Sequence, residues 1–319
     1  MLLYDPSRGL SLKLLVAGGA GFLGSHLSEA LLNDGHQVIA VDNLYTGSLD
    51  NIEHLQEHKN FEFIKHDINS LITLDVDGIF NLACPASPVH YQKDPIGTFY
   101  TCVFGSHNLL QLADLKKIKI LQASTSEIYG DPKVSPQRED YWGNVNSVGI
   151  RSCYDEGKRA AETLFSDFHR TRGTEIRIAR IFNTYGPRMA LNDGRVVSNF
   201  IVQALNGDPL TIYGDGSQIR SLCYVDDLVK GLIKLFFSNT YFGPINLGNP
   251  QPVTMNELAN EIIEITTSKS KIIYLPLPMD DPITREPDIT LAQDKLSWLP
   301  VVDRNIGLQK TVQYFKNII

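Results

Sequence analysis

The sequence is poor in cysteine and offers no cysteine pattern of the kind that binds a structural metal. Four cysteines occur in 319 residues, and no two of them form a C-x-x-C pair. They stand far apart, at Cys84, Cys102, Cys153 and Cys223. Zinc sites and disulfide frameworks depend on clustered or regularly spaced cysteines. We therefore expect free thiols in a reducing cytoplasm and no metal site.

The sequence also lacks a long apolar run and a run of basic residues. No stretch approaches the ~20 apolar residues that span a bilayer, and residues 1–11 contain Asp5 and Pro6 in place of a continuous apolar segment. The formal net charge of -7 is spread along the chain, and negative charge opposes binding to nucleic acids and anionic membrane surfaces. We therefore expect a cytoplasmic protein with neither a membrane nor a nucleic-acid partner.

What the sequence does contain is an alternation of short β-branched segments with longer amphipathic ones. With an apolar fraction of 43% and a charged fraction of 20%, this pattern predicts an α/β protein with a Rossmann-type, doubly wound parallel sheet. We expect strands at residues 13–17, 38–41, 61–65, 78–82, 119–123 and 175–181. We expect helices at residues 22–33, 95–115 and 152–172.

A glycine-rich turn, residues 18–24 (GGAGFLG), follows the first predicted strand. Glycines permit a sharp turn, a close approach of backbone N–H groups to a pyrophosphate and tight packing of helix on strand. Asp42 ends the second strand, where a carboxylate binds the adenosine ribose hydroxyls and repels the 2'-phosphate of NADP. A surface turn and a capping aspartate are the alternative interpretations. The combination predicts NAD, in contact with Gly18, Gly21, Phe22, Leu23, Gly24, Asp42, Asn43, Asp67, Ile68 and Leu82.

The chain is expected to divide near residue 181, because glycine and proline become frequent after it. Residues 12–181 are predicted to form the NAD-binding Rossmann domain. Residues 182–319 are predicted to form a smaller C-terminal α/β substrate lobe, with some segments returning to the first domain. Helices of this lobe are expected at residues 196–205, 225–237 and 255–266. The ligand site should lie between the two parts, at the carboxyl ends of the strands.

Tyr154 and Lys158 are four residues apart and so share one face of the predicted helix 152–172. A nearby ammonium favours the phenolate, so Tyr154 can act as a base near neutral pH while Lys158 also holds the nicotinamide ribose. Thr125 follows a strand and can donate to the same substrate oxygen. For Tyr154 and Lys158 alone, a solvated helix pair is the alternative. With the glycine turn, the three residues predict hydride transfer at a carbinol.

Several longer segments resemble the extended short-chain dehydrogenase/reductases, and within them the UDP-glucuronate decarboxylases. The resemblance runs from about Lys13 to the C-terminus. Its segments are 82–91 (LACPASPVHY), 124–132 (STSEIYGDP), 141–146 (YWGNVN), 151–159 (RSCYDEGKR) and 180–200 (RIFNTYGPRMALNDGRVVSNF). Related 4,6-dehydratases carry Asp-Glu after the threonine, and 4-epimerases generally lack an acid at the position of Glu127. The resemblance therefore points toward decarboxylation.

The resemblance implies a redox-neutral, NAD-dependent conversion of UDP-glucuronate to UDP-xylose through a 4-keto sugar. Tyr154 and Thr125 would act at the C4 oxygen, and Glu127 and Arg188 at the sugar carboxylate. A salt bridge between Glu127 and Arg188 is the alternative for that pair. A UDP-sugar 4-epimerase, a decarboxylase that releases the UDP-4-keto-pentose, and a catalytically silent NAD-binding protein are the alternative functions.

The resemblance also assigns the UDP-sugar mainly to the C-terminal lobe. Asn183 is expected at the diphosphate, Arg220 and Arg285 are expected to neutralise it, and Tyr213 is expected near the uridine. Surface ion pairing is the alternative for the arginines. The predicted substrate-binding residues are Tyr91, Asn183, Arg188, Val197, Tyr213, Arg220 and Arg285. A homodimer through helices 95–115 and 152–172 is the expected assembly.

Four residues depart from the family pattern. Cys102 stands where Asn is expected, Ser147-Val148 replaces an Asn-Pro-Ile-Gly pattern, and Ile150 stands where Pro is usual. These changes bear on fine positioning more than on the type of reaction.

Overall fold

The computed structural model describes residues 11–239, 241–276 and 284–319. The opening segment, for which we expected no continuous apolar run, lies outside the described residues except for Ser11. Within the part of the chain that the structure describes, no helix is both long and apolar enough to cross a membrane.

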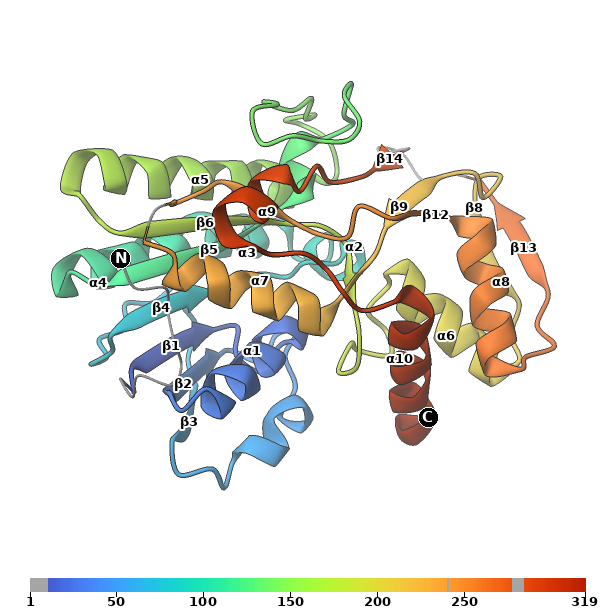
Figure 1. The fold of residues 1–319 in the computed structure, drawn as a ribbon, viewed down its shortest axis with the longest axis horizontal. Helices are drawn as coiled ribbons and strands as arrows, with labels where there is room; N and C mark the ends of the chain where they lie inside the picture. The colour runs from blue at the N-terminus through green and yellow to red at the C-terminus, as the bar shows by residue number, and fades with distance from the viewer. Residues whose placement is uncertain (1–10, 240, 277–283) are drawn as a thin grey trace.

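A parallel sheet with helices around it forms the left part of the molecule in the view of Figure 1. Among the described residues it has seven strands in the order β11-β6-β5-β4-β1-β2-β3. Every neighbouring pair is parallel. This order starts at β1 and winds outward in both directions, so the predicted doubly wound fold is confirmed. The strands are β1 (Lys13–Ala17), β2 (Gln37–Asp42), β3 (Phe61–Lys65), β4 (Gly78–Asn81), β5 (Lys119–Thr125), β6 (Ile176–Ile181) and β11 (Ile245–Leu247).

Helices cover both faces of this sheet. Alternate residues of β1 point to opposite faces, so Leu14 and Val16 belong to one buried cluster while Leu15 and Ala17 belong to another. On the first face lie α1 (Phe22–Asn33) and α7 (Val225–Phe237). On the second face lie α3 (Pro95–Tyr100), the π-helical turn η3 (Thr101–Gly105), α4 (Ser106–Lys116) and α5 (Ser152–Arg172). The predicted helix 95–115 is thus one helical rod interrupted by a π turn.

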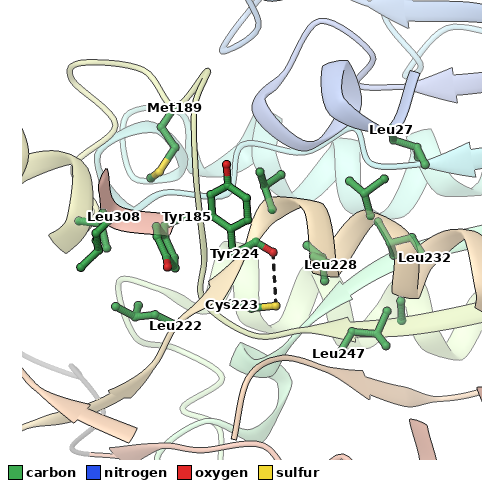
Figure 2. Packing of buried hydrophobic residues seen from close by; sticks show 14 of the residues in the cluster. Leu27, Tyr185, Met189, Leu222, Cys223, Tyr224, Leu228, Leu232, Leu247 and Leu308 are labelled. Carbon is green, nitrogen blue, oxygen red and sulfur yellow. Dashed lines mark hydrogen bonds between the residues drawn. The ribbon is translucent and has the colours of Figure 1, made fainter. Parts of the chain in front are cut away.

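One predicted location is wrong. We expected helix 225–237 in the C-terminal lobe, but α7 packs on the sheet against α1, β5, β6 and β11. Figure 2 shows part of this core, in which Leu228 and Leu232 of α7 lie between Leu27 of α1 and Leu247 of β11. The location was wrong because the apolar stripe of a helix does not specify which surface the helix will cover. In addition, β11 has only three residues, and a strand of this length is too short to recognise in the sequence. The division near residue 181 itself stays a prediction.

The C-terminal lobe combines helices with small sheets. Its helices are α6 (Val196–Asn206), α8 (Met255–Thr266) and α10 (Arg304–Ile318), and α9 (Thr290–Leu296) packs against β11. Its strands are β7 (Thr184–Tyr185), β8 (Leu210–Tyr213), β9 (Ile219–Ser221), β10 (Cys223–Tyr224), β12 (Pro252–Thr254), β13 (Ile272–Leu275) and β14 (Thr284–Arg285). The rings of Tyr185 and Tyr224 meet edge to face at 5.7 Å, and Leu308 of α10 belongs to the same cluster (Figure 2). Both parts of the chain therefore share one apolar core.

Candidate active site

A cleft of about 1390 Å³ lies at the carboxyl ends of β1, β2, β4, β5 and β6 and is bounded by the C-terminal lobe. Its wall contains every residue that we predicted for the cofactor, the chemistry or the substrate. The predicted residues in the wall are Gly18, Gly21, Phe22, Leu23, Gly24, Asp42, Asn43, Asp67, Ile68, Leu82, Tyr91, Thr125, Glu127, Tyr154, Lys158, Asn183, Arg188, Val197, Tyr213, Arg220 and Arg285. The structure brings them to one cleft, and their individual roles stay predictions.

The turn between β1 and α1 is shaped for close approach of a ligand. Gly18 has φ +77, and a Cβ atom there would come within 2.8 Å of the Leu82 backbone. A Cβ atom on Gly24 would lie 2.0 Å from the Gly18 carbonyl oxygen. No side chain caps the start of α1 at Gly21, so the helix presents its partial positive charge to the cleft. This cradle fits the pyrophosphate of a dinucleotide.

Asp42 lies beside this turn at the end of β2. Its carboxylate accepts hydrogen bonds from the backbone N–H groups of Ala20 at 3.1 Å and Leu44 at 2.8 Å. Burial raises the pKa of Asp42 above its ordinary value, although these backbone hydrogen bonds oppose the shift. Next to it, the amide of Asn43 donates to Asp67 at 3.1 Å. The arrangement holds a fixed acid at the place predicted for the ribose hydroxyls.

Thr125, Tyr154 and Lys158 come together at the end of β5 and the start of α5. Tyr154 is 6% exposed, its phenol and Thr125 both line the cleft, and Thr125 is close enough to lower the pKa of the phenol. The Lys158 ammonium donates to the Ala123 carbonyl oxygen at 2.8 Å and lies 5.8 Å from the centre of the Tyr154 ring. The strand end and the helix spacing thus produce the predicted constellation.

That Tyr154 acts as a base near neutral pH stays a prediction, and the surroundings of its phenol in the protein chain by itself disfavour the phenolate. Burial raises the pKa of Tyr154 well above its usual range, Cys84 raises it further, and Thr125 only partly offsets them. The Lys158 ammonium is directed to a backbone carbonyl. We expected its charge to dominate, but desolvation of the phenol is the larger effect.

Glu127 is held by two arginines. Its Oε2 atom accepts hydrogen bonds from Arg151 and Arg285. Arg285 is almost fully buried and also donates to the carbonyl oxygens of Ser126 at 2.9 Å and Gly130 at 3.1 Å. Burial alone would raise the pKa of Glu127, but Arg285 and Arg151 outweigh it and lower the pKa. These hydrogen bonds of Arg285 are all with the segment after Thr125, whereas we predicted Arg285 at the diphosphate.

The structure does not bring Arg188 to Glu127. Arg188, which has φ +67, donates to Glu29 of α1 and lies 3.1 Å from the His54 ring nitrogen. The alternative of a salt bridge between Glu127 and Arg188 is therefore wrong, since each of them has other partners. The action of Arg188 on the sugar stays a prediction, with no contact toward Glu127 to support it.

Tyr91 and Asp155 add two buried polar groups around Tyr154. The rings of Tyr91 and Tyr154 stack at 5.1 Å with an interplanar angle of 6°. The Tyr91 hydroxyl is buried and has no hydrogen-bond partner among the described residues. Asp155 lies 3.9 Å from Arg151, yet burial and then the charge of Glu127 raise its pKa to about 7. The region around Tyr154 is therefore densely charged and sheltered from water.

The remaining predicted substrate residues lie on the C-terminal side of the cleft. Asn183 follows β6 and its carbonyl accepts the Cys223 N–H at 2.9 Å. Val197 is buried in α6, and Tyr213 is half exposed at the end of β8. The positive charge of Arg220, on β9, helps to lower the pKa of Glu127.

Two groups in the cleft wall were missed by the sequence analysis. Arg151 stands within the quoted segment 151–159, but its partner Glu127 is 24 residues away. Arg195 pairs with Asp193, with a second contact at 2.7 Å, and lies 5.7 Å from the centre of the Phe22 ring. Asp193 and Arg195 both lie in the segment 180–200. The spacing of that segment did not indicate that Arg195 lies close to the glycine turn.

Comparison with known proteins identifies the family. The family model described as "NAD dependent epimerase/dehydratase family" matches residues 14–248. UDP-glucuronic acid decarboxylase 1 of Arabidopsis thaliana is 52% identical over 308 residues, which cover 97% of this chain and 71% of that protein. UDP-glucuronic acid decarboxylase 1 of Danio rerio is 52% identical over 316 residues, which cover 98% of this chain and 75% of that protein.

Solved structures give the same assignment of the fold. UDP-glucuronic acid 4-epimerase from Bacillus cereus, in complex with UDP-glucuronic acid and NAD, is 28% identical with a TM-score of 0.87 and covers 96% of this chain and 100% of its own. UDP-glucose 4-epimerase from Thermotoga maritima, with UDP-glucose, is 30% identical with a TM-score of 0.86 and covers 96% and 99%. The chain therefore belongs to the NAD dependent epimerase/dehydratase family, and the relatives that it resembles at about half identity are UDP-glucuronic acid decarboxylases.

Proposed function

We propose that this chain is a UDP-glucuronate decarboxylase, which converts UDP-glucuronate to UDP-xylose and leaves its NAD unchanged over the cycle. The relatives at about half identity are UDP-glucuronic acid decarboxylases, which supports this reaction. The Bacillus cereus structure contains NAD and UDP-glucuronic acid, which supports these two molecules as the ligands of this chain. The observation that carries the proposal is that Thr125 and Tyr154 share one cleft with Glu127, which two arginines hold.

The residues of the first domain fit the cofactor. The glycine turn and the start of α1 would hold the pyrophosphate, Asp42 the adenosine ribose and Lys158 the nicotinamide ribose. When bound, NAD supplies reversible acceptance of the hydride from C4 of the sugar. The negative charge of Asp42 disfavours a 2'-phosphate, so NAD is favoured over NADP.

Tyr154 takes the proton of the C4 hydroxyl, and Thr125 donates a hydrogen bond to the same oxygen. Both side chains line the cleft, and Thr125 is close enough to the Tyr154 phenol to lower its pKa, which supports their joint action. Because burial raises the pKa of Tyr154, the phenolate depends on positive charge nearby. Lys158, one helical turn further along α5, carries the ammonium that is best placed to supply it.

The 4-keto sugar is a β-keto acid, so carbon dioxide can leave with its bonding electrons passing into the C4 oxygen. Thr125 and Tyr154 then stabilise the negative charge on that oxygen. Glu127 follows Thr125 by two residues. The net charge of the group is +1, because the negative Glu127 is paired with two positive side chains, Arg151 and Arg285. This charge would attract the substrate carboxylate. The contacts favour Arg285 over Arg188 as the arginine at the carboxylate end of the sugar.

The decisive experiment identifies the product. The protein would be incubated with NAD and UDP-glucuronate labelled with carbon-13 at C6, and the nucleotide product and released carbon dioxide analysed by mass spectrometry and NMR. UDP-xylose with labelled carbon dioxide is the expected result. Accumulation of the UDP-4-keto-pentose would show that the enzyme stops after decarboxylation and releases the keto sugar. Formation of UDP-galacturonate without carbon dioxide would overturn the proposal in favour of 4-epimerisation.

We further propose that the chain forms a homodimer through the helical rod α3–η3. Its apolar side chains Ile96, Phe99, Tyr100 and Phe104 are exposed and recur every three to four residues, so they share one helical face. The rings of Tyr100 and Phe104 are in contact at 5.2 Å. An exposed apolar stripe beside α5 suits the self-complementary packing of a second copy related by twofold symmetry.

A further inference from the structure

Two cysteines that the proposed mechanism does not use lie in contact next to the cleft. The sulfur atoms of Cys84 and Cys102 are 3.3 Å apart, although 18 residues separate them in the sequence. Cys84 is partly exposed and forms part of the cleft wall. Cys102 is buried in the π turn η3. A reagent in the cleft therefore reaches Cys84 first and finds Cys102 directly behind it.

The two thiols are chemically unequal. Burial raises the pKa of the Cys84 thiol, but the hydrogen bond from Cys102 and the Lys158 ammonium outweigh it and lower the pKa. The same hydrogen bond and burial raise the pKa of Cys102. Cys84 is thus the better nucleophile, since the thiolate is the reactive form. Cys102 is placed to react with an oxidised Cys84 sulfur.

The pair also contacts the part of α5 that carries the proposed chemistry. A Cβ atom on Gly157 would lie 3.0 Å from the Cys102 Cβ atom and 3.2 Å from its sulfur, so η3 packs directly against the residue before Lys158. The segment between the two cysteines contains Tyr91, whose ring stacks on Tyr154. Movement of either sulfur is therefore transmitted to Lys158 or Tyr154.

We propose that Cys84 and Cys102 are an oxidation site, at which a peroxide forms an intramolecular disulfide that lowers the activity of the enzyme. The Cys84 thiolate attacks one peroxide oxygen, the O–O bond breaks, and hydroxide leaves and takes up a proton to give water and a Cys84 sulfenic acid. The Cys102 sulfur then attacks the Cys84 sulfur, the S–O bond breaks and a second water leaves. Two thiols lose two electrons and two protons in total, and hydrogen peroxide is reduced to two waters.

Disulfide formation must shift backbone or side chains near the active site. The sulfurs stand 3.3 Å apart, whereas a disulfide bond is about 2.05 Å long. Closing this gap pulls η3 away from Gly157 or moves the segment after β4 that borders the glycine turn. Displacements of about 1 Å at catalytic groups reduce turnover by up to about 100-fold, so a clear loss of activity is expected.

The cross-link itself is tested without reference to the reaction. The native protein would be treated with hydrogen peroxide, denatured with a thiol-blocking reagent and digested, and its peptides analysed by mass spectrometry. We expect loss of two of the four thiols and a linked pair of peptides that contain Cys84 and Cys102. Persistence of all four thiols, or linkage through Cys153 in its place, would overturn the proposal.

The effect on activity rests on the proposed function and is measured separately, as turnover of UDP-glucuronate. We expect peroxide to lower wild-type turnover at least about tenfold and dithiothreitol to restore it. Cys102→Ser and Cys102→Ala should keep their turnover under peroxide, whereas Cys153→Ser, the matched control, should lose it like wild type. Equal inactivation of the Cys102 variants, or a cross-linked enzyme with full turnover, would refute the regulatory effect. Failure of the proposed function would leave the peptide result unchanged.

Discussion

Tyr154 occupies a site in which three contacts have different consequences for its chemistry. The ring is covered by Tyr91, which excludes water and so disfavours the phenolate. Thr125 partly opposes that effect. The Lys158 ammonium, from the next helical turn, lies over the ring at 5.8 Å from its centre and donates to the Ala123 carbonyl oxygen. Burial and Cys84 therefore raise the pKa of the phenol, and Lys158 carries the ammonium that is placed to favour the phenolate.

Replacing Tyr154 with Phe tests whether this hydroxyl is the proposed base. We expect kcat to fall by about 100-fold to 10,000-fold, the range for loss of a general base, while UDP affinity changes little. Turnover and calorimetric UDP titration give the two values. Tyr100→Phe removes a hydroxyl from an exposed ring on α3 and should leave both unchanged. Full activity of Tyr154→Phe would show that another group moves the proton.

Asp155 makes the stability of the fold depend on pH. Burial and the charge of Glu127 raise the pKa of Asp155 in the folded state from its ordinary value of 3.8 to about 7. Between these values the folded state holds a proton that the unfolded state has released, so the free energy of unfolding falls as pH rises. Asp155→Asn removes this slope. From pH about 5 to about 8 the variant should gain roughly 2.7 kcal/mol relative to wild type, because about two pH units of this window lie below the folded pKa and each is worth about 1.36 kcal/mol.

Urea unfolding of both proteins across that pH range measures the difference. Asp167→Asn removes an exposed carboxyl from the same helix. Its free energy of unfolding should depend on pH in the same way as that of wild type. If the curve for Asp155→Asn is also parallel to wild type, the protonation assigned to Asp155 is incorrect.

At the residue scale, the sequence was informative where the partners are close along the chain or at a strand end. Four-residue spacing placed Tyr154 and Lys158 on one face, and the end of a predicted strand placed Thr125 near them. The pairing of Glu127 with Arg285 joins residues 158 positions apart, and Arg188 meets Glu29 across 159 positions. Such contacts depend on how the lobes pack, which no local pattern encodes.

At the element scale, the turn between β1 and α1 makes a prediction about NAD. Gly24→Ala places a methyl group 2.0 Å from the Gly18 carbonyl oxygen, so α1 must move away from β1 and its N-terminus away from the pyrophosphate. We expect NAD affinity to fall at least about tenfold, comparable to the loss of a charge-assisted contact. Calorimetric titration with NAD provides the measurement.

Gly173→Ala is the matched control for this change. Gly173 ends α5 with φ +71, and an added Cβ atom would meet nothing within 4 Å. The substitution should cost about 1–2 kcal/mol of stability through backbone strain without weakening NAD binding. Equal NAD affinities for wild type and Gly24→Ala would show that the cofactor does not depend on this turn.

Element types were more predictable than element positions. The periodicity predicted α1 and α5 with the bounds that the structure has, because each carries a long amphipathic stripe between clear end signals. The same periodicity identified residues 225–237 as helical but could not say that the helix covers the sheet. The π turn within the rod α3–η3–α4 was also missed, since one extra residue per turn leaves the apolar pattern almost unchanged.

At the scale of the whole molecule, one continuous core fixes the two sides of the cleft relative to each other. Leu27 of α1, Leu228 of α7 and Leu308 of α10 belong to the same buried cluster, so the two parts of the chain are tied together by packing. Glu127, two residues after β5, and Arg285 of β14 form a hydrogen bond in the wall of the cleft. The active site is therefore built by the packing of both parts and would not survive their separation.

The proposed homodimer gives the last prediction. Four exposed apolar side chains on α3–η3 supply less than the roughly 800 Å² per partner of a stable interface, so neighbouring parts of α5 must join them. Phe104 lies in this stripe and is 52% exposed. Phe104→Glu would bury a charge in the proposed interface, where it faces the second copy of the chain. It should weaken the dimer at least about 30-fold, the scale of an interface hot spot.

Leu299→Glu is the matched control, because Leu299 is also 52% exposed but lies between α9 and α10. Sedimentation should give wild type and Leu299→Glu twice the chain mass of 35.6 kDa and Phe104→Glu a value close to that of one chain. A monomeric wild type, or dissociation of both variants alike, would place any self-association on another surface.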